Sequence, residues 1–423
     1  MAVLFHGMDR MLSLIRLAAG ALLTASASTS PSIAVAAARP GPSHWVATWQ
    51  ASPQRVWGAG FLFPTGIPDV LRNQTFRQTA RISLGGPQLR VRFSNAYGTA
   101  PVRIGAANVA GSAGAPPVAL SFDGQPGAAI PPGQDRVSDP LALPTRDLQA
   151  IQVDVYVPAA TRLQTFHWDG RQTSAIAPGN QTGNAALADS TPTTARLFMT
   201  GIEVEAPAAA RSVVVIGDSI TDGATASLDH DQRWTDHLAA RLAPQGMAVV
   251  NAGISGGRLL RDGMGESALS RFQRDVLEQP GVASVVVLVG INDISWPGTA
   301  FARDQARPTL AELQAGYRQL IERAHAHGVR IIGATLTPFA GALPGTPLDD
   351  YHAPAKDKLR QQLNAWLRRE APFDAVVDLD RALRDPTDHT RLAPAYDSGD
   401  HLHPGDAGNR AMAEAVDLAV FGE

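Results

Sequence analysis

Hydrophobic and polar residues alternate along much of the chain between residues 44 and 205. In residues 89–94 every second residue is Leu, Val or Phe, and residues 151–157 alternate in the same way, with Asp154 at a polar position. A period of two puts one face of a strand on a core and the other toward water. Clusters of Gly and Pro separate these runs, as turns require. The pattern predicts an all-β, sandwich-like or jelly-roll-like domain over residues 44–205.

From residue 211 onward the pattern of hydrophobic residues indicates strands that alternate with loops and helices. Five continuous apolar runs, rich in β-branched residues, occupy residues 212–217, 247–253, 283–290, 329–336 and 374–379. Strands that crossover helices bury on both faces have this pattern. Between them, residues 308–328 are the clearest helix, with Pro308 in its first turn and Gly328 at its end. The alternation predicts a doubly wound α/β domain over residues 211–423, with a parallel sheet of five strands. Its active site is expected at the carboxyl ends of these strands.

Composition narrows the possible functions. The chain of 423 residues is 44% hydrophobic and 18% charged, which is apolar enough for a large core. Its formal charge is −3 without any block of like charge, so a nucleic-acid partner is not expected. The absence of cysteine excludes disulfides, thiolate zinc sites, iron–sulfur clusters and a cysteine nucleophile.

The N-terminus has the features of an export signal. Arg10 and Arg16 precede a short apolar run, residues 17–25, and small residues follow at 34–38. This order predicts a signal peptide over residues 1–38 and a secreted or periplasmic protein, whereas an Ala-rich leader without that role is the alternative. Outside this segment no stretch of about 18 apolar residues occurs, so a membrane span is not expected.

The first segment with candidate chemistry is Gly217-Asp218-Ser219, directly after a predicted strand. A serine on a tight strand-to-helix turn presents its hydroxyl above the sheet edge, where the amino end of the next helix favours an anion. Ser219 is therefore the candidate nucleophile. A serine that only caps the helix is the alternative. The spacing differs from the G-x-S-x-G turn of ordinary α/β-hydrolases.

Two further loops follow predicted strands. Residues 251–257 are rich in glycine, which lets backbone amides approach a ligand, and Asn292 offers a side-chain amide to the same position. Each loop taken alone is more typical of plain turn chemistry. Together they are candidates for the groups that bind an oxyanion.

The last segment places Asp400 three residues before His403, ahead of the final predicted helix. An aspartate at this distance can bond the imidazole, fix its tautomer and stabilise the imidazolium that forms when histidine accepts a serine proton. A surface histidine beside a structural aspartate is one alternative, and a metal site at His401 and His403 is another. No cysteine and no helix-borne pair of ligands supports the metal, so we expect none.

These four segments in this order resemble the GDSL esterase/lipase family, also called SGNH hydrolases, over about residues 211–420. The resemblance implies a flavodoxin-like sheet and a serine ester hydrolase without a cofactor. It implies a triad of Ser219, Asp400 and His403. It further implies an oxyanion hole of Ser219, Gly256 and Asn292, with Gly253 as the alternative glycine.

A looser resemblance concerns the stretches GINDISWPG and HWVATWQASPQ, which are similar to a subgroup allied to bacterial xylan-associated esterases. It implies a polysaccharide carrying O-acetyl groups as the substrate. The loops 257–267 and 337–351 contain Gly, Pro and charges, and they predict a wet, shallow cleft instead of an apolar lid. A lipase or broad short-chain arylesterase acting on small esters is the alternative, and an inactive carbohydrate-binding protein is a further one. The oligomeric state is left open.

Some other residues invite a functional interpretation. Trp45, Trp49, Trp57 and Trp168 could stack on sugar rings, but packing in the core or between domains is favoured for them. His167 and residues 229–231 are expected to be polar surface.

Overall fold

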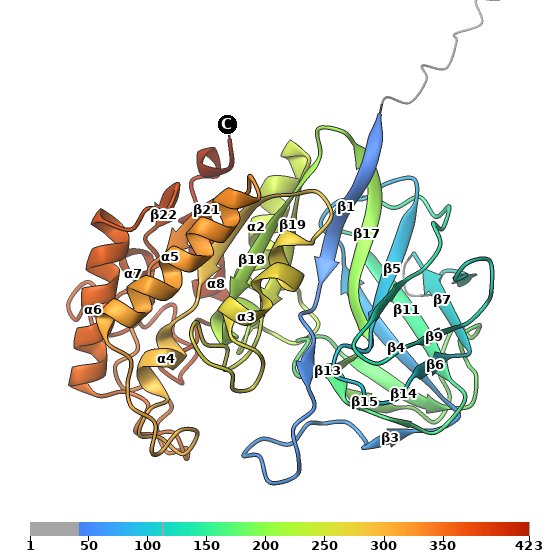
Figure 1. Ribbon diagram of the computed structural model, residues 1–423, viewed down its shortest axis with the longest axis horizontal. Helices are drawn as coiled ribbons and strands as arrows, with labels where there is room; N and C mark the ends of the chain where they lie inside the picture. Colours follow the sequence, from blue (N-terminus) through green and yellow to red (C-terminus); the bar gives the residue numbers. More distant parts are fainter. Residues whose placement is uncertain (1–41, 112–113, 423) are drawn as a thin grey trace, which may run out of the picture. The chain divides into compact units, whose positions relative to one another are not determined.

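The computed structural model describes residues 42–111 and 114–422 (Figure 1). These residues belong to one compact unit. The predicted signal peptide, residues 1–38, lies outside the described residues. None of the described helices combines the length and the apolarity that a membrane crossing needs.

The first half of the described chain is built from antiparallel strands. One sheet has the order β1 (Ser43–Gln50), β17 (Met199–Pro207), β5 (Leu89–Ser94) and β10 (Asp135–Val137). The other has the order β15 (Thr191–Thr193), β14 (Ser174–Pro178), β4 (Gln74–Arg81), β11 (Ala150–Val157), β7 (Ala106–Ala110) and β8 (Val118–Ala119). Short ladders join β12 (Thr161–Arg162) to β3 (Val70–Leu71), β6 (Val102–Ile104) to β9 (Ala128–Ile130), and β13 (Thr165–His167) to β16 (Arg196–Leu197) and β2 (Gln54–Arg55).

The two larger sheets share one apolar core, as the period-two pattern predicts. Val91 and Phe93 of β5 belong to the same buried cluster as Val153 and Val155 of β11. Asp154 occupies a polar position of this pattern, but its side chain is buried and not directed to water. Arg77 on the neighbouring strand β4 forms a bidentate ion pair with it, which compensates the buried charge.

The second half contains the predicted parallel sheet. Its order is β19 (Met247–Gly253), β18 (Arg211–Gly217), β20 (Val282–Leu288), β21 (Arg330–Ala334) and β22 (Ala375–Val377), all parallel. The strand of this sheet that comes first in the sequence, β18, lies inside the sheet. The next strand, β19, pairs on one side of it, and β20, β21 and β22 follow in turn on the other side. This is the doubly wound, flavodoxin-like arrangement that the sequence predicts.

Helices connect the parallel strands. They are α1 (Ser219–Asp222), α2 (Trp234–Leu242), α3 (Ala268–Phe272), α4 (Ile291–Ser295), α5 (Leu310–Ala326), α6 (Pro354–Arg369), α7 (Leu379–Leu383) and α8 (Asp406–Glu414), with short turns η1 (Ala243–Gln245), η2 (Gln273–Leu277) and η3 (Leu418–Phe421). Helix α5 packs with α3 and α6, and α2 packs with α8. Figure 1 shows α5 running across the front of the sheet. A capping box of Thr309 and Glu312 starts α5, so Pro308 precedes the helix instead of lying in its first turn.

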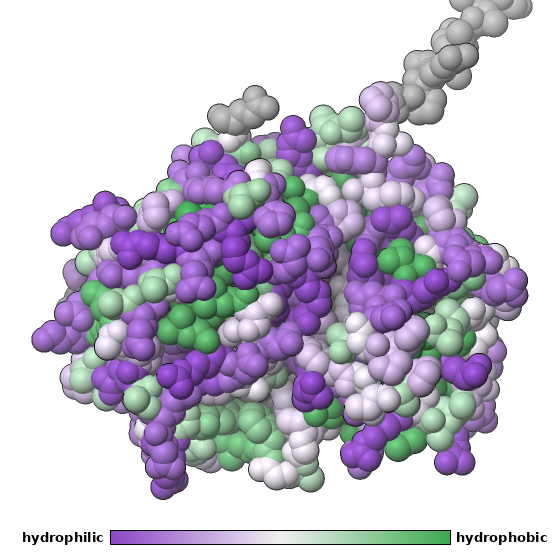
Figure 2. Space-filling model, viewed as in Figure 1, coloured by the Kyte–Doolittle hydropathy of each residue, from purple (hydrophilic) through white to green (hydrophobic). Residues whose placement is uncertain are grey.

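Strand β1 connects the β-rich half to the parallel sheet. Val46 and Trp49 of β1 belong to the core of the β-rich half, whereas Ala47 packs into the core of the parallel sheet. The hydroxyl of Ser212 at the start of β18 donates to the carbonyl of Ala47 at 2.9 Å. The two halves therefore share buried contacts. On the face drawn in Figure 2, polar side chains cover most of both halves and apolar side chains form separate patches.

A buried arginine of α3 holds the carboxyl ends of the neighbouring strands β18 and β19. The guanidinium of Arg271 donates to the carbonyls of Gly217 on β18 and Ala252 on β19, at 2.9 and 2.6 Å. It also pairs with Asp275 at 3.0 Å and donates to the hydroxyl of Ser52 at 3.3 Å. Its side chain has no exposed surface. One residue thus connects both strand ends and the β-rich half.

We expect Arg271→Met to lower the free energy of unfolding by about 3–5 kcal/mol, because the change removes one partner of a buried ion pair and the donor to two strand-end carbonyls. Urea unfolding measures this value. Arg318→Met is the matched control, since Arg318 lies on the exposed face of α5, and we expect it to cost less than 1 kcal/mol. Equal losses in the two variants would contradict the role of Arg271.

Candidate active site

Ser219 lies where the sequence predicts, on the turn between β18 and α1. A side chain at Gly217 would meet the hydroxyl of Thr221 at 2.1 Å and a carbonyl of β20 at 2.6 Å, so this sharp turn requires glycine. Asp218 caps the helix, because its carboxylate accepts from the N–H of Ile220 at 3.0 Å. Ser219 is the first helical residue and is 9% exposed. Its hydroxyl therefore points from a fixed backbone at the carboxyl edge of the sheet.

The structure brings Ser219, His403 and Asp400 together in one hydrogen-bonded row. The hydroxyl of Ser219 lies 2.8 Å from Nε2 of His403, and Nδ1 of His403 lies 2.6 Å from Oδ2 of Asp400. The other oxygen of Asp400 accepts the N–H groups of Leu402 and His403. In this arrangement Nδ1–H donates to the carboxylate, which leaves Nε2 free to accept the serine proton.

Asp400, which belongs to this row, and Asp218, which precedes Ser219, differ in charge state. Burial would raise the pKa of Asp400, but the hydrogen bond and charge of His403 outweigh it and hold this pKa well below its usual range. Burial raises the pKa of Asp218 to about 7, because it outweighs the cap bond from Ile220 and the charge of His403, which lower this pKa. Asp400 therefore stays ionised near neutral pH, whereas Asp218 titrates there.

The glycine-rich loop after β19 places Gly256, not Gly253, in the wall of the cavity at Ser219. The N–H of Gly253 already donates to the side chain of Asn251 at 2.8 Å. Gly256 lines the cavity together with Ser219 and His403. It has a φ of +71°, and a side chain on it would meet the indole of Trp296 at 2.8 Å. The geometry thus favours Gly256 as the glycine that presents its backbone to a ligand.

Asn292, near the start of α4, lines the same cavity. Its amide donates one hydrogen to the carbonyl of Gly257 at 2.9 Å, and its oxygen accepts from the hydroxyl of Tyr351 at 2.7 Å. These two bonds fix which end of the amide is nitrogen. Because an amide nitrogen carries two hydrogens, one remains for a ligand.

Sequence reasoning missed the roles of Tyr351 and Asp293 beside Asn292. Tyr351 is 2% exposed, and burial raises its pKa well above the usual range, so it remains a donor to Asn292. Asp293 accepts the N–H groups of Leu259 and Leu260 at 2.7 and 2.9 Å and fixes the loop after Gly257. No spacing signal points to Tyr351, which lies 59 residues from Asn292.

The prediction that His167 lies on a polar surface is wrong. His167 ends β13, is 5% exposed, and contacts the carboxylate of Asp222 at 2.9 Å. The other carboxylate oxygen of Asp222 accepts the N–H and the hydroxyl of Ser255, the residue before Gly256. The error arose because the partner of His167 is in the other half of the chain. By contrast, Asp229 and His230 are exposed, as expected.

The cavity at Ser219 has a volume of about 320 Å³. Most of its wall is apolar, and both halves of the chain contribute to it: Leu62, Phe63 and Trp168 come from the β-rich half, and Met264, Trp296, Phe301, Leu343, Pro347, Leu348 and Leu402 from the other. The loops 257–267 and 337–351 thus supply apolar groups here, unlike the wet cleft that their composition predicts. Two of their charged residues, Arg261 and Asp349, are exposed to solvent.

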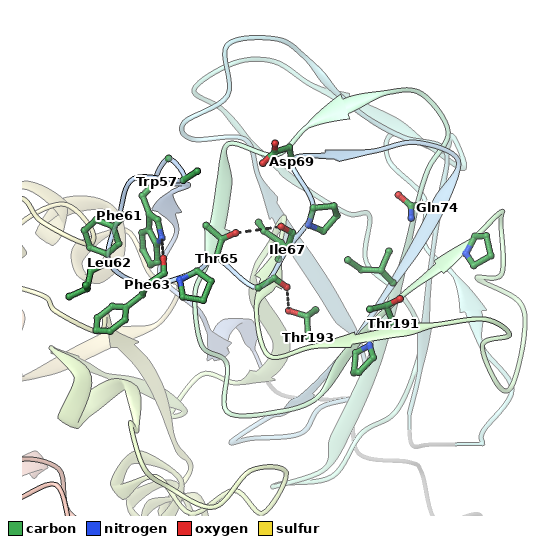
Figure 3. A pocket seen from close by; sticks show the side chains of 18 of the residues that line it. Trp57, Phe61, Leu62, Phe63, Thr65, Ile67, Asp69, Gln74, Thr191 and Thr193 are labelled. Atoms are coloured by element: carbon green, nitrogen blue, oxygen red, sulfur yellow. Dashed lines mark hydrogen bonds between the residues drawn. The ribbon is translucent and has the colours of Figure 1, made fainter. Parts of the chain in front are cut away.

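A second hollow, of about 870 Å³, lies beside the cavity on the β-rich half. Leu62 and Phe63 line both spaces. Figure 3 shows Trp57, Phe61 and Phe63 at one end of this hollow, and the polar side chains of Thr65, Asp69, Gln74, Thr191 and Thr193 along the rest. The hollow therefore adjoins the cavity and has a more polar lining.

Aromatic rings form the boundary between the cavity and the hollow. Phe61 stacks on Phe301 with 5.6 Å between ring centres, and Phe63 stacks on Trp168 at 5.4 Å. Trp57 contacts both Phe61 and Trp168. The faces of Trp57 and Trp168 are thus engaged in packing, in line with the packing role favoured for them.

The two histidines considered for metal binding have separate carboxylate partners. His401 bonds to Asp397 at 2.5 Å, and His403 bonds to Asp400. Within residues 42–111 and 114–422 no group of three or more His, Asp or Glu side chains is arranged to hold a metal ion.

A comparison with protein families matches residues 215–411 to the GDSL-like lipase/acylhydrolase family. This half of the chain is a GDSL-like hydrolase domain. The match includes Ser219, Gly256, Asn292, Asp400 and His403, and it agrees with the resemblance of the sequence motifs. A comparison of the sequence with curated proteins gives no match.

Solved structures similar to part of this chain include a lipase and an esterase. A GDSL-like lipase from Bacteroides thetaiotaomicron is 20% identical, with 50% of this chain and 87% of that chain covered and a TM-score of 0.36. An acetylxylan esterase from Geobacillus stearothermophilus is 24% identical, with 50% of this chain and 94% of that chain covered and a TM-score of 0.36.

The pKa of Asp218 gives a prediction for the GDSL-like domain. The value rises from about 3.9 in an unfolded chain to about 7 in the folded protein. The folded state therefore holds the proton more tightly, and this group lowers stability as pH rises from about 4 to 7. Asp218→Asn keeps the cap oxygen but has no proton to lose. We expect the stability of Asp218→Asn relative to the wild type to rise between pH 4 and 7 and to level off above.

Urea unfolding at a series of pH values measures this difference. Asp378→Asn is the control, because Asp378 also caps a helix but its hydrogen bonds and the charge of Arg368 lower its pKa below the usual range. We expect its difference from the wild type to be constant above about pH 5. A flat profile for Asp218→Asn between pH 4 and 8 would contradict the prediction.

Proposed function

We propose that the protein is a serine ester hydrolase that uses Ser219 as its nucleophile. The hydroxyl of Ser219 attacks the ester carbonyl while Nε2 of His403 takes its proton, and the new imidazolium faces the carboxylate of Asp400. The observation that carries this proposal is the row of bonds Ser219–His403–Asp400, at 2.8 and 2.6 Å. It is supported by the family match of residues 215–411.

The tetrahedral intermediate places a negative oxygen beside Ser219. The backbone N–H groups of Ser219 and Gly256 and the free hydrogen of the Asn292 amide are the proposed donors to it. His403 then returns the proton to the leaving alcohol, and an acyl group remains on Ser219. A water molecule, deprotonated by His403, attacks this acyl group and releases the acid.

An inactive carbohydrate-binding protein is the competing function from a different class. A protein that only binds carbohydrate does not need mutual bonds among these side chains. Here each member of the row has a partner, and Tyr351 holds Asn292 in the orientation that donates. These contacts support the hydrolase.

The nucleophile is tested with a fluorophosphonate probe and a short p-nitrophenyl ester. We expect the wild type to be labelled once, at Ser219, and Ser219→Ala to lose both the label and the turnover. Full activity in Ser219→Ala would refute the assignment. A folded wild-type protein that takes no label and releases no p-nitrophenol would favour the inactive binding protein.

Asn292→Ala distinguishes the oxyanion donor from the nucleophile in the same assay. Loss of one such donor lowers turnover by roughly 100- to 1000-fold, equal to about 2.7–4 kcal/mol. We expect that loss in kcat, with Ser219 still labelled slowly. An unchanged rate would remove Asn292 from the mechanism.

The first substrate candidate is a polysaccharide that carries O-acetyl groups. The looser sequence resemblance favours it, and the hollow beside the cavity supports it. That hollow has hydroxyl, amide and carboxyl groups, among them the exposed Asp189 and Thr191 and the half-buried Gln74, which suit the hydroxyls of neighbouring sugar rings. Because Leu62 and Phe63 line both spaces, a chain held in the hollow would lie beside the cavity at Ser219.

The second candidate is an ester with a larger apolar group, as in a lipase or an arylesterase. The observation that favours it is the apolar wall of the cavity at Ser219, with Phe63, Trp296 and Phe301 among its residues. An acetyl group buries little of such a wall, whereas a longer acyl chain gains about 0.8 kcal/mol for each buried CH₂ group.

A substrate panel separates the two candidates. Acetate release from acetylated xylan, xyloglucan and pectin is compared with hydrolysis of p-nitrophenyl esters of increasing chain length. For the polysaccharide candidate we expect Thr191→Arg, which fills the hollow, to reduce acetate release several-fold while p-nitrophenyl acetate turnover is unchanged. Leu348→Ala is the matched variant for comparison with Thr191→Arg, because Leu348 lines the cavity and not the hollow. Rates that climb toward long acyl chains, with no acetate from any glycan, would refute the carbohydrate and leave the triad intact.

We also propose that the enzyme is secreted or periplasmic, because residues 1–38 have the order of charged, apolar and small residues typical of a signal peptide. Export would bring it to polymeric substrates outside the cytoplasm.

A further inference from the structure

His167, a buried histidine of the β-rich half, is linked through Asp222 to the loop that carries Gly256. His167 has two ring nitrogens, and each faces an oxygen that can accept a hydrogen. Nδ1 lies 3.0 Å from the carbonyl of Ser52, and Nε2 lies 2.9 Å from Oδ1 of Asp222. A carbonyl oxygen cannot donate, so Nδ1 carries a hydrogen. If Asp222 is ionised, Nε2 must carry one as well, and the ring is an imidazolium.

The charges around the pair favour that state. Burial disfavours the charge on both groups, but the charge of Asp222 and its hydrogen bond raise the pKa of His167 above its usual value. The charge of His167 likewise lowers the pKa of Asp222 despite burial. Arg233 is the other charged group that acts on both, and it lowers both pKa values.

The carboxylate of Asp222 has no spare oxygen. Oδ1 is bonded to His167, and Oδ2 accepts the N–H of Ser255 at 2.9 Å and its hydroxyl at 2.8 Å. Asp222 is the last residue of α1, the helix that Ser219 begins. The peptide bond after Ser255 supplies the N–H of Gly256. Asp222 thus connects the nucleophile helix to the loop that carries the proposed oxyanion donor.

We propose that His167 is a positioning residue for ester hydrolysis, which as an imidazolium holds Asp222 and thereby fixes the N–H of Gly256 relative to Ser219. This inference rests on the proposed function of Ser219. It gives the β-rich half a part in the reaction besides lining the cavity. Its effect should appear in the transition state, because the donor it fixes binds the oxyanion and not the ground-state ester.

The test compares His167→Leu, His167→Gln and a control from the same buried contact between the halves. Gln50→Leu is that control, because Gln50 is 6% exposed and donates to the carbonyl of Asp275 at 3.0 Å, and neither residue lines the cavity. The measurements are kcat and KM for p-nitrophenyl acetate and the affinity for phenylboronic acid. This acid adds to a serine hydroxyl and places a negative oxygen where the oxyanion forms.

A misplaced catalytic group costs up to about a hundredfold in rate. For His167→Leu we expect kcat to fall about ten- to a hundredfold, KM to change less than twofold, and boronate affinity to fall by the same factor as kcat. His167→Gln retains a donor toward Asp222 but carries no charge, so it should recover only part of the loss. Gln50→Leu should leave kcat within twofold. Equal losses in Gln50→Leu and His167→Leu, or unchanged kcat and boronate affinity in His167→Leu, would overturn the proposal.

A second readout does not depend on activity. In ¹⁵N NMR spectra of the wild-type protein, both ring nitrogens of His167 should carry hydrogens at pH 7, with the signals assigned by their absence in His167→Gln. A neutral His167 would overturn the proposal. If Ser219 takes no fluorophosphonate label, the proposed function fails, while the NMR result still reports on the His167–Asp222 pair.

Discussion

The geometry of the candidate site depends on the buried guanidinium of Arg271. Strands β18 and β19 end side by side, and each is followed by a loop with one candidate group, Ser219 or Gly256. Backbone carbonyls at such strand ends need donors once they are shielded from water. Arg271 supplies donors to Gly217 and Ala252 together, so the two loops begin from one fixed point. Its bond to Ser52 extends the same restraint to the β-rich half.

Three aspartates near Ser219 differ in charge state because their side chains have different hydrogen-bond partners and surroundings. Asp400 is ionised because His403 donates to it, and it can stabilise an imidazolium. Asp222 is ionised because His167 and Ser255 use both of its oxygens. Asp218 has one backbone donor and no ion-pair partner, so burial raises its pKa to about 7. Its second oxygen is buried without a hydrogen bond among the described residues, which an ionised carboxylate would tolerate poorly.

The sequence predicted the elements whose signal is local. The five runs of β-branched residues became β18 to β22, because strands buried on both faces leave no polar positions to obscure the pattern. Ser219 and Asn292 could be placed because each directly follows such a run. Asp400 and His403 could be paired because three residues separate them. In each case the informative neighbour lies within one element or one turn.

The remaining features depend on contacts between distant parts of the chain. Tyr351 orients Asn292 across 59 residues, and His167 reaches Asp222 across 55. Asp154 looked like a surface residue because its partner Arg77 lies on another strand. The lining of the cavity was mispredicted for a related reason. The composition of a loop reports its average polarity, whereas the fold selects which of its side chains face inward, and here Leu343 and Leu348 do so.

These contacts make the β-rich half a component of the site and not an appendage. It supplies Phe63 and Trp168 to the cavity wall, and His167 to the carboxylate behind Gly256. A wall that is shared between two halves can change with one of them, so substitutions in residues 57–68 can change the cavity without contacting Ser219, Asp400 or His403. The bond of His167 cannot vary so freely, because a buried Asp222 without its partner would carry an uncompensated charge. The β-rich half therefore combines a variable surface for the substrate with a fixed contact for the chemistry.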